Sequence, residues 1–128
     1  MANYSYRKTV SLPFGEVVEK VKDSLAKEGF GIQAEIDLAR AMREKLGVKF
    51  EDYVILAACN PQLAHRAHAA ETDVGLLLPC HVIVYRDGDT VRIAVARPTV
   101  VLGVAGNPEL MRVAQEAEIQ LIQALDAA

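Results

Sequence analysis

The residues best suited to chemistry are the two cysteines and three histidines of the chain, which all lie within 23 positions of one another. They occur in CNPQLAHR (residues 59–66), at position 68, and in LLLPCH (residues 76–81). Thiols and imidazoles serve as nucleophiles, proton carriers and soft metal ligands. A chemical or binding site is therefore expected in this part of the sequence.

Cys59 ends an apolar run, YVILAAC, and Asn60-Pro61 after it is typical of a helix start. The free N–H groups of a helix start stabilise an anion, so the position suits a reactive thiolate or an anionic ligand. Free cysteine is also one of the most buried residue types, and Cys59 can be a small core residue instead. The sequence leaves both interpretations open.

His65 falls in the second turn of the same predicted helix, with His68 three residues later on a similar face. With Cys59 and Cys80, they could hold zinc, copper or haem. Metal sites usually need three or four ligands, however, and the spacings match no finger, ribbon or haem-attachment pattern. We therefore expect no metal, and His65 can equally cap or pack.

Cys80 follows Pro79 at the start of a predicted strand, where proline is tolerated. It could face Cys59 across neighbouring strands, and reversible disulfide chemistry requires their Cα atoms to lie within ~7 Å. A Cys and His pair also suggests nucleophilic catalysis, but no nucleophile signature accompanies it. Whether the protein is an enzyme stays open.

Hydrophobic periodicity predicts the elements that position these residues. Strands are expected over residues 4–11 (an outer strand), 30–36 (half buried), 53–59 (central, covered on both faces), 80–86 and 90–97, the last two joined at Asp87-Gly88-Asp89. Helices are expected from Pro13 to Gly29, from Asp37 to Gly47 with Leu38, Met42 and Leu46 buried, over 61–70, and from Pro108. The order β-α-β-α-β-α-β-β-α favours an α+β two-layer sandwich, a mixed, largely antiparallel sheet of about five strands backed by helices.

Composition narrows the class of protein. The 128 residues suit a single domain over 1–128, with 52% hydrophobic and 24% charged residues. The net charge of −3 and the lack of a basic cluster argue against nucleic acid. No apolar run approaches the ~20 residues of a membrane span, and no signal core opens the chain. We expect a cytoplasmic protein with free thiols.

Four segments carry a resemblance to a known family: GFG (29–31), EID (35–37), YVILAACNPQLAHR (53–66) and GLLLPC (75–80). They resemble the uncharacterised bacterial and archaeal proteins grouped as the domain of unknown function numbered 302. The resemblance implies a compact α+β fold of the TATA-binding-protein-like kind that often forms homodimers, and implies no reaction. His68 and His81 are less typical of that family.

These observations predict a homodimeric small-molecule-binding domain whose cleft is lined by Cys59, Asn60, His65 and Cys80. The helix start would bind an anionic group, His65 would hydrogen-bond or transfer a proton, and the thiols would supply soft contacts. Three alternatives remain: a thiol-dependent enzyme or redox protein of sulfur metabolism, a metal or haem protein, and a motif that serves only packing and dimerisation. The cofactor, if any, is unknown. Residues 98–102 are too apolar for an ordinary loop and could cover a pocket mouth or a dimer surface, and residues 103–106 read as a flexible connector.

Overall fold

The computed structural model describes residues 3–128 and contains a five-stranded sheet in the order β1-β5-β4-β3-β2. The strands are β1 (Ser5–Val10), β2 (Gly31–Asp37), β3 (Tyr53–Cys59), β4 (Cys80–Asp87) and β5 (Thr90–Ala96). The helices are α1 (Phe14–Lys27), α2 (Leu38–Leu46), α3 (Pro61–Ala70), α4 (Pro98–Val101) and α5 (Pro108–Ala127), with 3-10 turns η1 (Thr72–Leu76) and η2 (Leu102–Ala105). The predicted α+β class is confirmed, the predicted elements occur in the expected order with α4, η1 and η2 as additions, and all four strand pairings are antiparallel.

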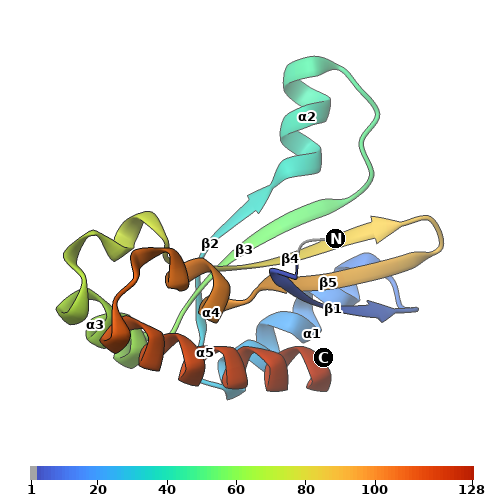
Figure 1. Ribbon diagram of the computed structural model, residues 1–128. Coiled ribbons are helices and arrows are strands. Elements are labelled where there is room, and N and C mark those ends of the chain that lie inside the picture. Colours follow the sequence, from blue (N-terminus) through green and yellow to red (C-terminus); the bar gives the residue numbers. More distant parts are fainter. Residues whose placement is uncertain (1–2) are drawn as a thin grey trace.

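Helices α1 and α5 cover one face of the sheet (Figure 1). Each has an apolar stripe at helical spacing, as the sequence predicts, and those stripes pack on the alternate strand residues that point toward them. The largest buried side chains of this core are Leu25, Phe30, Leu56, Ile93, Leu110, Leu121 and Leu125. Among the described helices, none combines the length and the apolar character needed to cross a bilayer.

The opposite face of the sheet is only partly shielded, which corrects one expectation for β3. Its residues alternate between a buried set, Val54, Leu56 and Ala58, and a second set in which Tyr53 and Ile55 stay half exposed. The strand is an interior one, between β2 and β4, but it is not covered on both faces along its length. Its continuous apolar sequence reflects β-branched and aromatic pairing across the open face, such as the stacked rings of Tyr53 and Tyr85.

Strand β2 is not the half-buried strand that its alternation predicts. A bulge between Ile32 and Ala34 shifts its register against β3, so Ile32 pairs with Ala58 and Ala34 pairs with Ala57. One extra residue moves all later side chains to the other face. Ile36 therefore lies on the open face with 48% of its surface exposed. Glu35 instead turns toward α1, where Lys22 Nζ lies 2.5 Å from its carboxylate.

Helix α2 stands apart from the two layers, at the far end of β2 and β3 (Figure 1). It begins at Asp37, whose side chain accepts a hydrogen bond from the N–H of Arg40, and ends at Gly47 in the left-handed conformation. The predicted burial of its apolar stripe is wrong. Only Ala39 is buried, and Leu46 is 67% exposed. We call α2, with the flanking residues 36 and 47–50, the arm.

Residues 98–105 form helical turns rather than the predicted loop and flexible connector. The carboxylate of Glu118 on α5 holds this segment in place. It accepts hydrogen bonds from the N–H (3.0 Å) and hydroxyl (2.6 Å) of Thr99 and from Arg97 Nε (3.2 Å). These bonds fix the two turns against α5, where they form one wall of the candidate site.

Candidate functional site

Strands β3 and β4 bring the two cysteines to the same end of the sheet. Ala58 pairs with Cys80 across the two strands, and Cys59 is the next residue of β3. Both residues are free thiols of intermediate burial. The register thus brings the two cysteines to neighbouring positions, but Cys80 pairs directly with Ala58 and not with Cys59.

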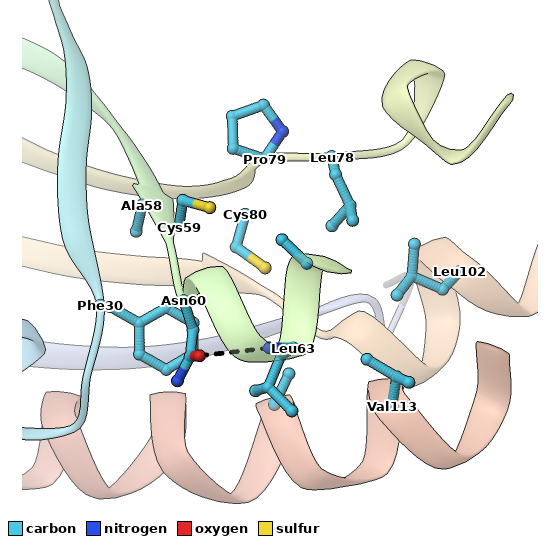
Figure 2. A pocket seen from close by; sticks show the side chains of 12 residues that line it. Phe30, Ala58, Cys59, Asn60, Leu63, Leu78, Pro79, Cys80, Leu102 and Val113 are labelled. Carbon is cyan, nitrogen blue, oxygen red and sulfur yellow. Dashed lines mark hydrogen bonds between the residues drawn. The ribbon is translucent and has the colours of Figure 1, made fainter. Parts of the chain in front are cut away.

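The two cysteines line a small hollow between the end of the sheet and helices α3 and α5, which we call the inner hollow (Figure 2). No charged side chain lines it. The volume of the cavity is about 40 Å³. That space exceeds the ~10–15 Å³ that one water needs but is far below the ~300 Å³ of a typical ligand pocket. Its lining consists of Phe30, Ala58, Cys59, Asn60, Leu63, Ala64, Leu78, Pro79, Cys80, Leu102, Val113 and Ala117.

Asn60 connects three elements at this hollow. Its side-chain oxygen accepts a hydrogen bond from the N–H of Leu63 (3.2 Å), the cap drawn in Figure 2, and its Nδ2 donates to Gln120 on α5 (3.3 Å). Its Nδ2 would also lie 3.0 Å from a Cβ at position 29, where Gly29 has a φ of +84°. Each polar side-chain atom of Asn60 therefore makes one hydrogen bond within the fold and keeps the capacity for a second.

The start of α3 consequently offers few free donors to an anion. Asn60 takes the N–H of Leu63, and Pro61 has none. The N–H of Ala64 already bonds to the carbonyl of Asn60 at 2.8 Å. Of the first turn, this leaves the N–H of Gln62, a residue on the exposed side of the helix.

The thiol of Cys80 lies in apolar surroundings, and its sulfur points from β4 toward α3 (Figure 2). Burial, aided by the nearby Cys59, raises the pKa of this thiol to about 11. Burial in a medium of low dielectric disfavours the charged form, so Cys80 is neutral at pH 7. The inner hollow is therefore uncharged on the Cys80 side, and Cys80 itself is a poor nucleophile there.

The three histidines do not gather at the inner hollow. His65 and His68 are exposed on α3, and His65 is not part of the lining. His68 instead approaches Gly75 of η1. His81, which is less typical of the resembled family, lines a second hollow next to Cys80. Within residues 3–128, no three residues of the His, Cys, Asp and Glu types cluster as a metal ion would require.

That second space, which we call the outer hollow, adjoins the inner one. Leu78, Pro79, Cys80 and Leu102 line both. The outer hollow has a volume of about 220 Å³. His81 is the only titratable side chain in its lining besides Cys80. The apolar segment 98–102 contributes its helical wall, consistent with the expectation that it covers a pocket mouth. The remaining lining residues are Leu76, Leu77, His81, Ala96, Pro98 and Val101.

Sequence reasoning missed most of the lining of the inner hollow. Phe30 and Val113 are apolar residues with no chemical signature, whereas Leu78 and Leu102 lie in the segments 76–81 and 98–102 that the sequence did single out. A weak signal existed in GLLLPC, because three leucines before a proline form an unusually apolar connection between elements.

The comparisons with known proteins identify the class of protein. The family model described as "Domain of unknown function DUF302" matches residues 6–128, and the chain belongs to that family. A solved structure, the crystal structure of an uncharacterized conserved DUF302 protein from Bacillus stearothermophilus, is 35% identical in sequence. The similarity covers 98% of each chain with a TM-score of 0.92. No curated protein matches the chain.

Proposed function

We propose that the protein is a small-molecule-binding domain, and that the buried part of its ligand is apolar and uncharged. The observation that carries this proposal is the lining of the inner and outer hollows, which contains many aliphatic side chains, two thiols, and no acidic or basic group other than His81. A charged group placed there would lose its hydration without gaining a partner. Cys59, Asn60 and Cys80 are the polar members of the inner wall.

The inner hollow is small, so a ligand reaches it through the outer hollow and enlarges it by moving side chains. Leu78 is half buried and lines both spaces, and its displacement would join them. His65 lies outside both linings. The proposal therefore assigns ligand contact to Cys59, Asn60 and Cys80 and not to His65.

Native mass spectrometry of the freshly purified protein tests this proposal. We expect an additional non-covalent mass that is retained by His65→Ala and lost from Ala64→Leu, which fills the inner hollow. Ala69→Leu on the exposed part of α3 is the matched control and should retain the mass. Equal retention by Ala64→Leu and Ala69→Leu would place the ligand elsewhere and refute the proposal.

A thiol redox function is the second candidate, because both thiols line one hollow and lie on paired strands. Oxidation by diamide, followed by measurement of the intact mass, distinguishes this redox function from the binding function proposed above. Loss of two hydrogens from the wild type, absent in Cys59→Ser and Cys80→Ser, would favour redox chemistry. Two unmodified thiols under the same treatment would reject it.

We also propose that the protein is a homodimer that buries the arm. The sequence of α2 has a stripe suited to burial, yet Leu46 (67% exposed), Ile36 (48%) and Val48 (44%) are uncovered within the chain. Exposed apolar side chains gathered on one projecting element are typical of an interface. Analytical ultracentrifugation should show a dimer that Leu46→Glu dissociates, whereas Ile119→Glu, an exposed apolar residue on α5, should not. A monomeric wild type would refute this part.

A further inference from the structure

A third hollow extends the outer one onto the open face of the sheet. It is lined by residues of β1, β3, β4 and β5, and it shares His81 and Ala96 with the outer hollow. Its volume is about 280 Å³. Each hollow shares lining residues with the next, and together the three linings extend around the end of the sheet from the core to its open face. We call this series the track.

The two ends of the track differ in polarity. Its inner end is enclosed by aliphatic side chains and thiols, whereas its outer end contains Arg7, Ser5 and the side chains of Tyr4, Tyr53 and Tyr85. Along the lining, Arg7 is the single arginine or lysine, and no aspartate or glutamate lines any of the three hollows. A ligand that follows the track would thus meet a hydrocarbon environment first and a cation last.

Arg7 has a guanidinium group available for a ligand. Its Nε donates to Ser5 Oγ at 3.2 Å, and in residues 3–128 it forms no ion pair with a carboxylate. Arg92, on the same face of the sheet, is by contrast held by Asp87 at 3.0 Å. A planar guanidinium with free donors matches the geometry of a carboxylate.

The mouth of the outer hollow has an apolar lip. Leu76 and Leu77 both line it, and Leu76 keeps 87% of its surface exposed, so an apolar molecule in the outer hollow would contact this leucine. From this lip, the uncharged inner end and the cation at the outer end, we propose that the track binds a single-chain amphiphile with an anionic head. Its hydrocarbon chain occupies the inner and outer hollows, and its carboxylate binds Arg7. This inference rests on the proposed small-molecule function and specifies its ligand class.

Fluorescence titration tests the assignment, because the chain has no tryptophan and Leu76→Trp therefore introduces a single reporter at the lip. In that background, dodecanoate is titrated below its micelle concentration alongside methyl dodecanoate, which has the same chain but no charge. We expect saturable binding of dodecanoate and at least tenfold weaker binding of the ester. Arg7→Ala should weaken dodecanoate binding about tenfold, as removing a charge-assisted hydrogen bond does, and leave the ester unchanged.

Arg92→Ala is the matched control for general positive charge on this face of the sheet. It should change the affinity for neither dodecanoate nor the ester. Equal losses in Arg7→Ala and Arg92→Ala would overturn the head-group assignment. A second contrary result would be equal affinity for acid and ester, with both affinities weakened by Ala64→Leu. That result would reject carboxylate binding by Arg7 and leave the small-molecule proposal standing. Saturable binding that Ala64→Leu does not change would show that the chain lies outside the inner hollow and overturn both. Absence of saturable binding by either compound would overturn the amphiphile inference alone.

Discussion

Two helix starts in this protein have the same Asn-Pro sequence and the same local geometry, but different surroundings. Asn60 and Asn107 have φ/ψ values of −100°/110° and −108°/116°, and each caps the first turn of its helix. The amide of Asn107 donates to the carbonyl of Ala70 at 2.9 Å, which ties two elements together away from the hollows. Asn60 lines the inner hollow. The capping motif specifies a helix start, and only the neighbouring chain determines whether that start borders a site.

The largest difference in stability between the two helix starts is expected when the glycine beside each asparagine is replaced. Gly29→Ala must adopt a φ of +84° and place its Cβ 3.0 Å from Asn60 Nδ2, whereas Gly106→Ala adopts a φ of +64° and its Cβ meets no atom within 4 Å beyond its chain neighbours. A left-handed alanine alone costs ~1–2 kcal/mol. We expect Gly29→Ala to lower the free energy of unfolding by about 3 kcal/mol and Gly106→Ala by about 1 kcal/mol in urea titrations. Equal losses would show that Asn60 moves aside without cost.

The next largest effect on stability comes from the uncharged thiol of Cys80. No comparable thiol lies beside the helix start at Asn107 in the described part of the chain. Because the folded-state pKa of about 11 lies above the ordinary value of 9.0, the folded protein binds this proton more tightly than the unfolded chain. The resulting stability is complete below pH 9 and disappears as pH rises through 11. Relative to Cys80→Ala, the wild type should lose about 2 kcal/mol between those limits. A constant difference would contradict the buried, neutral thiol.

Replacing the two asparagines compares the starts directly. Asn60→Ala and Asn107→Ala should each cost about 1 kcal/mol, since each removes a helix cap. Only Asn60→Ala should alter the retention of the co-purified ligand, measured by native mass spectrometry. Equal loss of ligand from both variants would mean that helix stability, and not contact with Asn60, controls retention.

The smallest effect concerns the wall built by α4. Although burial opposes its ionisation, hydrogen bonds from Thr99 and the charge of Arg97 lower the pKa of Glu118 below its usual value of 4.5. Its contribution is therefore present above the unfolded-state pKa and lost as pH falls through the folded-state one. Glu118→Gln should cost about 1 kcal/mol at pH 7. That difference should vanish at acidic pH in urea titrations, and persistence would exclude ionisation as its source.

Much of the fold could be predicted because local rules govern it. The Asn-Pro starts, the Gly88 turn between β4 and β5, and the amphipathic stripes of α1 and α5 each follow from residues close in sequence. The bulge in β2 could not be predicted, because the alternation Phe30, Ile32, Ala34, Ile36 is uninterrupted in the sequence. Tertiary pairing with β3 overrides that pattern.

The candidate site was predictable in part for a similar reason. Cys59, Asn60 and Cys80 border the inner hollow because strand register and a helix start bring them there. His65 does not, since helical spacing fixes which residues share a face but not which face meets the core. Arg7 was not expected near the site, because long-range pairing of β1 with β5 brings it there and local sequence patterns do not predict that pairing.

The bulge in β2 also affects how the exposed edge of the sheet could pair with another strand. β2 is an edge strand, and a regular edge offers unpaired N–H and C=O groups that template the addition of another strand. The displaced register interrupts that row, and Glu35 and Asp37 place charge along the short remainder. We therefore expect this edge to add a further strand poorly, so a partner docked at the arm would be held by side chains and not by a continuous sheet.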